Sequence, residues 1–78
     1  MIVRHFKVLI EYAPEDMAWV TYVPALDNLS TYGETREEAL ENTKEAILGY
    51  LEAAEKEGIQ VPAEATDAEL VDIEVAVA

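Results

Sequence analysis

The stretch YGETREEALENTKEAILGYLEAAEKEG, residues 32–58, decides the fold because it predicts one long amphipathic helix. Thr35 followed three residues later by Glu38 is a capping box, which favours a helix start at this point. Gly58 is typical of a helix end. Gly49 costs about 1 kcal/mol relative to alanine inside a helix, and close approach to a strand would explain it. The apolar stripe consists of Ala39, Leu40, Thr43, Ala46, Ile47, Tyr50, Leu51 and Ala54.

The segments around this helix have the pattern of β-strands. Residues 2–12 alternate apolar with polar side chains, and residues 17–23 are β-branched and aromatic up to Pro24. Residues 29–33 predict a short third strand, and residues 69–78 alternate again and predict a fourth. The order βββαβ predicts an α+β fold of two layers, in which one amphipathic helix packs on a small, mostly antiparallel sheet.

The last predicted strand, with the sequence VDIEVAVA at residues 71–78, is unusually apolar. Such a row of side chains would be sticky if it were left as an open sheet edge. Pairing with another subunit or with a partner strand would cover it, and so would a place in the middle of its own sheet.

The chain is strongly acidic and yet apolar enough to fold. Its 78 residues contain 17 Asp and Glu against 5 Lys and Arg, which gives a net charge of -12, and 51% of them are hydrophobic. We expect one domain over residues 1–78, stabilised as a homo-oligomer because so short a chain has a small core. The negative surface favours a basic protein partner over direct contact with nucleic acid, although it would equally serve for solubility alone.

Cysteine is absent, so neither a disulfide framework nor thiolate chemistry is available. No apolar run approaches the roughly 20 residues of a membrane span, and the first residues lack the pattern of a signal peptide. We therefore expect a cytoplasmic protein without membrane contact.

Catalytic chemistry has little support in the sequence. Glu11 could lie beside Asp72 and Glu74 and hold a metal ion, but these acids also fit the solvated face of half-buried strands, and none is at ligand spacing. His5 could act as a general base with Glu11, although a lone strand histidine is more often a surface residue. We expect no catalytic, cofactor-binding or metal-binding residue, and no cofactor.

Aromatic and acidic residues are better candidates for binding a protein. Trp19 and Tyr22 alternate onto opposite faces of the second predicted strand, so one ring is expected outside the core. That ring would either bind a partner or cover sheet surface under the helix or a loop. Glu41 and Glu45 fall away from the apolar stripe, where they would either attract a basic partner or only solvate the helix. Together with Tyr32, these four residues are the candidate partner-binding set.

The run from the second strand into the helix resembles the HicB-like antitoxins. That family has an aromatic strand, then V-P-D-L-P-G-C, a short strand ending in G-D-T, then E-E-A and a helix ending near a Gly and an I-P. The loop departs from this pattern, because residues 25–29 read ALDNL. The matching positions are Val23, Pro24, Leu26, Gly33, Thr35, Glu37, Glu38, Ala39, Glu45, Ala46, Ile47, Tyr50, Leu51, Gly58 and Pro62.

The resemblance implies a partial ribonuclease H-like fold without the nuclease carboxylates, assembled as a dimer or tetramer. It also implies binding to a small basic mRNA-cleaving toxin of the HicA type, whose active face the protein would mask. Many family members carry a C-terminal DNA-binding module, and we expect none in residues 1–78. The alternatives are an orphan oligomer that binds a small ligand or another protein, and a residual metal-dependent nuclease using Glu11, Asp72 or Glu74.

Overall fold

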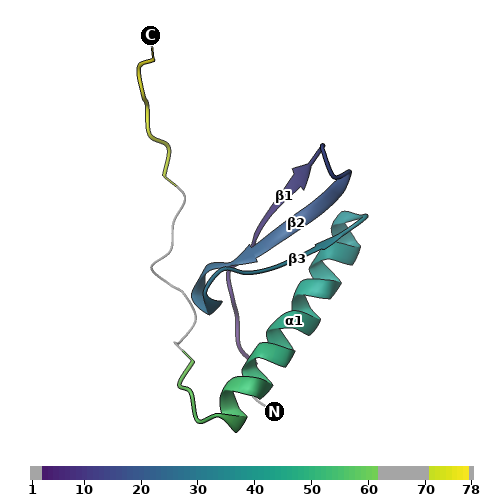
Figure 1. Ribbon diagram of the computed structural model, residues 1–78, viewed down its shortest axis with the longest axis vertical. Coiled ribbons are helices and arrows are strands. Elements are labelled where there is room, and N and C mark those ends of the chain that lie inside the picture. Colours follow the sequence, from purple (N-terminus) through teal and green to yellow (C-terminus); the bar gives the residue numbers. More distant parts are fainter. Residues whose placement is uncertain (1–2, 62–70, 78) are drawn as a thin grey trace.

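The computed structural model describes residues 3–61 and 71–77 and has an α+β architecture of two layers (Figure 1). Three antiparallel strands form a sheet in the order β1-β2-β3, and one helix packs on one face of it. The predicted fold class is thereby confirmed. The elements are β1 (Leu9–Ala13), β2 (Ala18–Val23), the 3-10 turn η1 (Pro24–Leu26), β3 (Leu29–Gly33) and α1 (Arg36–Lys56).

Both connections between strands contain residues with left-handed backbone. The β1–β2 turn is closed by the Asp16 amide, which donates to the Ala13 carbonyl at 3.1 Å, and Met17 takes a φ of 48°. After η1, Asp27 and Asn28 have φ values of 56° and 57°, a conformation in which Asp and Asn are enriched. This left-handed pair reverses the chain into β3.

Both ends of α1 are capped as the sequence predicts. The Thr35 side chain accepts a hydrogen bond from the Glu38 amide at 3.0 Å, and the Glu38 carboxylate accepts one from the Glu34 amide at 2.8 Å. At the other end Gly58 has a φ of 69°, and the Ile59 amide donates to the Ala54 carbonyl at 2.8 Å. This is the Schellman arrangement, in which a left-handed glycine satisfies the last carbonyls of the helix.

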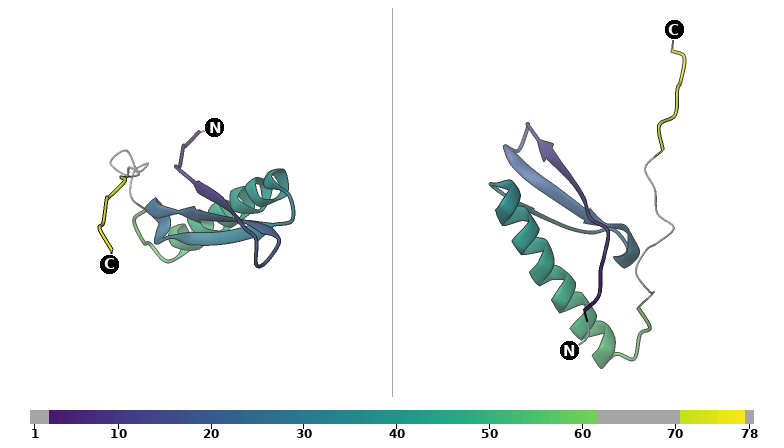
Figure 2. Two further views of the ribbon diagram at one scale, coloured as in Figure 1. Left: turned by 90° about the horizontal axis from the view of Figure 1, so that it is seen from above. Right: turned by 180° about the vertical axis from the view of Figure 1, so that it is seen from behind.

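The helix lies mainly over β3 and to a lesser extent over β2 (Figure 2). Its small residues face the sheet, because Ala39 and Ala54 are buried in this contact. At the centre two hydroxyls meet between the layers: the Thr21 and Thr43 oxygens lie 2.5 Å apart, and Thr43 donates to the Ala39 carbonyl at 2.6 Å. A hydroxyl has one hydrogen, so Thr21 is the donor in the bond between the two threonines.

Close approach of backbone to backbone occurs at Gly33, the last residue of β3. A Cβ there would lie 2.8 Å from the Ala39 Cα and from the Glu38 carbonyl carbon, and closer still to the Ala39 nitrogen. Gly49 is different, because a Cβ added there would meet nothing within 4 Å. Close approach to a strand therefore does not explain Gly49. The residue at which the helix and the sheet leave no space for a side chain is Gly33.

The first strand is shorter than the alternating pattern of residues 2–12 predicts. Residues 3–8 are in no strand, and pairing with β2 starts at Leu9, which is opposite Tyr22. The physical reason is that β2 ends at Val23, where Pro24 begins a 3-10 turn, so the earlier residues have no neighbouring strand to pair with. They run instead alongside the C-terminal half of α1 (Figure 2).

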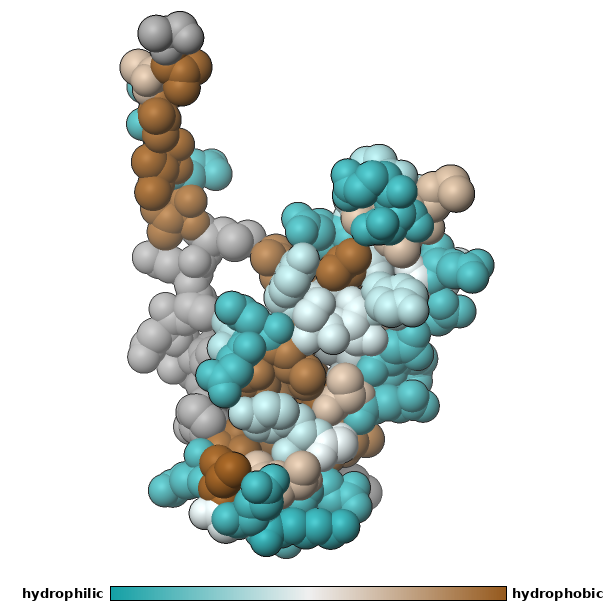
Figure 3. Space-filling view, viewed as in Figure 1, coloured by the Kyte–Doolittle hydropathy of each residue, from teal (hydrophilic) through white to brown (hydrophobic). Residues whose placement is uncertain are grey.

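The predicted fourth strand is wrong for the residues that can be described. Residues 71–77 belong to no strand, and all seven are exposed. They form a separate extended segment, with hydrophobic side chains drawn in brown in Figure 3. Alternation of apolar and polar side chains makes a sequence compatible with a sheet, but a strand also needs a neighbour to bond with, and the structure supplies none here. The remaining residues of the prediction, 69, 70 and 78, lie outside the described part.

We predict opposite effects for the same substitution at the two glycines. Gly33→Ala should lower the free energy of unfolding by about 3 kcal/mol, because the new methyl group collides with the backbone of α1. Gly49→Ala should raise it by about 1 kcal/mol, because it improves helix propensity in open space. Urea unfolding at one protein concentration measures both. If Gly33→Ala does not fold, it can be measured in the Gly49→Ala background. Equal effects at the two sites would contradict the close approach.

A double-mutant cycle should show that the two buried hydroxyls are coupled. Thr43→Val should cost about 2 kcal/mol, because Thr21 then keeps only the Thr31 carbonyl, at 3.4 Å. Thr21→Val should cost about half as much, because Thr43 still donates to Ala39. The double variant should cost about 1 kcal/mol less than the two single costs together, as unfolding curves would show. Additive costs would contradict the hydrogen bond between the two threonines.

Candidate protein-binding surfaces

The face of the sheet that points away from α1 is uncovered in the described structure. Thr21 and Val23 are buried against α1, so their neighbours Val20 and Tyr22 point to the opposite side. The strand register places two rows across this side, one through Tyr22 and one through Val20. We call it the open sheet face. Its residues are Leu9, Glu11, Val20, Tyr22, Ser30 and Tyr32.

Two of the candidate partner-binding residues lie on the open sheet face. Tyr32 is 67% exposed and is opposite Val20. Tyr22 is half-buried and is opposite Ser30. Tyr side chains combine a large apolar ring with a hydroxyl that stays hydrated, which suits a surface that is wet until a partner arrives. The open sheet face therefore has the composition of a small interface core.

Trp19 lies on the other side of the sheet, as alternation along β2 predicts. Its ring meets that of Tyr12 edge to face, with 5.4 Å between the ring centroids and 63° between the planes. Both rings flank the end of the sheet where Gly33 is opposite Trp19. Trp19 is half-buried in this aromatic pair. It lies on the same side of β2 as Thr21, so it is not part of the surface that contains Tyr22 and Tyr32.

The helix glutamates form a third location. Glu41 and Glu45 are exposed and are one turn apart on the side of α1 opposite the buried Ala39 and Thr43. The thickness of a helix, about 10 Å, and of the sheet separates them from the open sheet face. The structure thus brings Tyr22 and Tyr32 together, but it does not unite them with Trp19 or with the helix glutamates.

The acids considered for metal chemistry are not gathered together. Glu11 is on the open sheet face, whereas Asp72 and Glu74 are in the separate 71–77 segment. Among residues 3–61 and 71–77, no three His, Cys, Asp or Glu side chains are placed to hold one metal ion. Nor does this part of the chain contain a helix with the length and apolarity needed to cross a bilayer.

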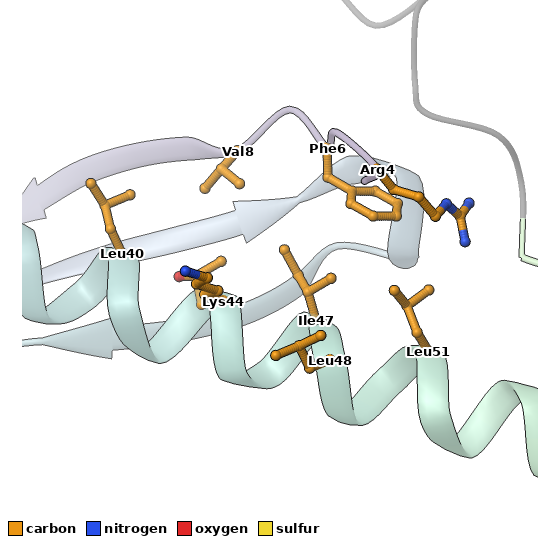
Figure 4. A pocket seen from close by; sticks show the side chains of 9 residues that line it. Arg4, Phe6, Val8, Leu40, Lys44, Ile47, Leu48 and Leu51 are labelled. Carbon is orange, nitrogen blue, oxygen red and sulfur yellow. The ribbon is translucent and has the colours of Figure 1, made fainter. Parts of the chain in front are cut away.

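An apolar groove, not foreseen from the sequence, lies between α1 and residues 4–8 (Figure 4). Its volume is about 350 Å³. The larger apolar residues of the helix point into it from one side, and Phe6 and Val8 line the other. The signal in the sequence is the set of larger side chains in the helix stripe, because Leu40, Ile47 and Leu51 all line the groove. The lining residues are Arg4, Phe6, Val8, Leu40, Thr43, Lys44, Ile47, Leu48 and Leu51.

Comparison with known proteins identifies the family. The model of the HicB_like antitoxin of bacterial toxin-antitoxin systems matches residues 6–75. A UPF0150 protein of Thermoplasma acidophilum is 46% identical over 48 residues, which cover 62% of this chain and 70% of that protein. No solved structure matches the chain. The family match covers the sheet, the helix and most of the 71–77 segment, and the chain therefore belongs to the HicB_like antitoxin family.

Proposed function

We propose that this protein is the antitoxin-like partner of a small basic HicA-type toxin that cleaves mRNA, and that it acts by covering the toxin without chemistry of its own. The observation that carries the proposal is the family match over residues 6–75. The net charge of -12 supports it, because a basic toxin is attracted to such a chain. The proposal places the protein in the cytoplasm, where mRNA is found, and includes assembly into a homo-oligomer.

The open sheet face is the contact surface in this proposal. An interface of ordinary size covers about 800 Å² on each partner and takes most of its energy from a few central aromatic or Arg side chains. Tyr22 and Tyr32 supply such side chains, and Val20, which is opposite Tyr32 in the same row, adds apolar surface. A basic partner also finds Glu11 within the same face. The side chains of α1 offer no comparable aromatic surface on their exposed side.

Glu41 and Glu45 have a different role in the proposal, namely acceleration of encounter. They are on the far side of the molecule from the open sheet face, so they do not touch a toxin bound there. Their field is screened within about 8 Å at physiological salt but reaches about 30 Å at 0.01 M. They therefore contribute to long-range attraction at low salt only, whereas Tyr22 and Tyr32 contribute to the bound state at any salt.

We expect Tyr32→Ala to weaken the complex about tenfold, mainly through faster dissociation, because an exposed aromatic ring of the contact surface is lost. Tyr12→Ala is the matched control, since Tyr12 is 47% exposed but lies on the other side of the sheet. The partner is the product of the adjoining gene, which we expect to encode a short protein rich in Lys and Arg. Surface plasmon resonance gives both rate constants. Equal effects of the two substitutions on the rate constants would exclude the open sheet face as the contact surface.

We expect the double charge reversal Glu41→Lys, Glu45→Lys to slow association at 0.01 M salt and to change it little at 0.15 M, with the dissociation rate unaltered. The fold itself should keep its stability, because both side chains are exposed. The same binding measurement at the two salt concentrations tests this. Faster dissociation would place the toxin on the helix instead.

Co-expression with the adjoining gene product, followed by a mass measurement, tests the proposal as a whole. A complex that contains both chains and that blocks RNA cleavage by the partner supports it. If no basic neighbour is encoded and no partner co-purifies, the proposal is wrong and the chain is an orphan member of its family.

A further inference from the structure

The 71–77 segment has two chemically distinct sides, and all seven of its residues are exposed. Val71, Ile73, Val75 and Val77 alternate along it and are between 65% and 87% exposed. Asp72 and Glu74 occupy the alternate positions, which point the other way in an extended chain. A row of four exposed β-branched side chains is costly in water and has the pattern of a strand that is buried on one side.

The edge of the sheet at β1 offers the backbone that such a strand needs. β1 is at one end of the sheet, so the side away from β2 presents unpaired N–H and C=O groups within the described structure. Residues 3–8 continue this edge and belong to no strand. The opposite edge, at β3, is less available, because the Asn42 side chain donates to the Tyr32 carbonyl there at 2.8 Å.

The side chains at the β1 edge complement the segment on both sides. Phe6 and Val8 line the apolar groove. The apolar side chains of a strand placed beside residues 3–8 would therefore point into the same groove. Lys7 alternates onto the other side. It would there share a surface with Asp72 or Glu74, and opposite charges on neighbouring strands attract. Apolar residues thus meet apolar residues and a cation meets acids, whichever direction the strand runs.

The described part of the chain also has few buried side chains to stabilise it. Its buried hydrophobic residues are Ala18, Val23, Leu26, Ala39 and Ala54, of which only two are larger than alanine. On the helix, Leu48 remains 59% exposed at the groove. Filling the groove with valine and isoleucine would supply the missing apolar burial.

We infer that the groove is filled by residues 71–77 of a second copy of this chain, in a reciprocal exchange that makes a two-fold dimer. Within one chain the segment stands clear of the groove and of the sheet (Figures 1 and 2). An exchange covers the segments and the grooves of both copies at once, because each copy supplies one of each. Two-fold symmetry closes the assembly, so no segment and no groove stays uncovered. The open sheet face is not used, so the dimer forms whether or not a toxin is the partner.

The first test is the mass of the full chain in solution, with and without a charge in the segment. The unaltered protein should have twice the 8.7 kDa of one chain. Ile73→Lys should reduce the mass to that of one chain, because a third cation would enter a groove that is apolar apart from Arg4 and Lys44. Ala76→Lys is the matched control on the opposite row and should leave the dimer intact. A monomeric natural chain, or a dimer that survives Ile73→Lys, would overturn the inference. Helicity by circular dichroism checks that the variants are folded.

The second test separates exchange from pairing within one chain. The chain has no cysteine, so two can be introduced as the only thiols. We expect Val8→Cys with Ile73→Cys, or with Val75→Cys to allow for the register, to give a disulfide-linked dimer on mild oxidation. Val8→Cys with Ala76→Cys should not cross-link. A disulfide closed within a monomer would show that each groove takes the segment of its own chain. If Val8→Cys forms no disulfide with either Ile73→Cys or Val75→Cys, this groove is excluded as the docking site.

Discussion

The contact of Gly33 with the first turn of α1 sets the position of every other part of this structure. Because Gly33 has no side chain, the backbone of the helix comes down onto the last residue of β3 at Ala39. The strand and the helix are joined by only two residues, so the direction of the helix is fixed almost where it begins. The capping bonds of Thr35 and Glu38 then determine the turn at which helical hydrogen bonding starts.

The anchoring at one end of the sheet has an asymmetric result. The helix lies over β3, where its alanines allow close packing, while its larger side chains Leu40, Ile47 and Leu51 point toward residues 4–8 and are only partly covered. The groove and the unpaired edge of β1 are therefore two aspects of the same geometry. The side of the sheet away from the helix is left uncovered for a simpler reason, since the described chain has only one helix to place on two faces.

Signals that depend on neighbouring residues were sufficient for prediction, and those that depend on a distant partner were not. The helix, its two caps, the bounds of β3 and the opposed faces of Trp19 and Tyr22 all follow from local patterns. Alternation in residues 3–8 and 71–77 also predicts strands, but whether a strand forms depends on a neighbouring strand to pair with. The two glycines also depend on distant partners, because nothing in the local sequence distinguishes Gly33, which is tightly packed, from Gly49, which is not. The family was recognised from ordered motifs, whereas the division of its candidate binding residues among three surfaces required the fold.

The hydrogen bond between Thr21 and Thr43 selects one alignment of the two layers. The buried residues of α1 are Ala39, Thr43 and Ala54, whose short side chains on their own fix the position of the helix only weakly. The two hydroxyls restrict this position, because a shift would break the hydrogen bond between them, which is worth about 1 kcal/mol. The hydrogen bond between the two hydroxyls therefore favours one position of the helix along the sheet.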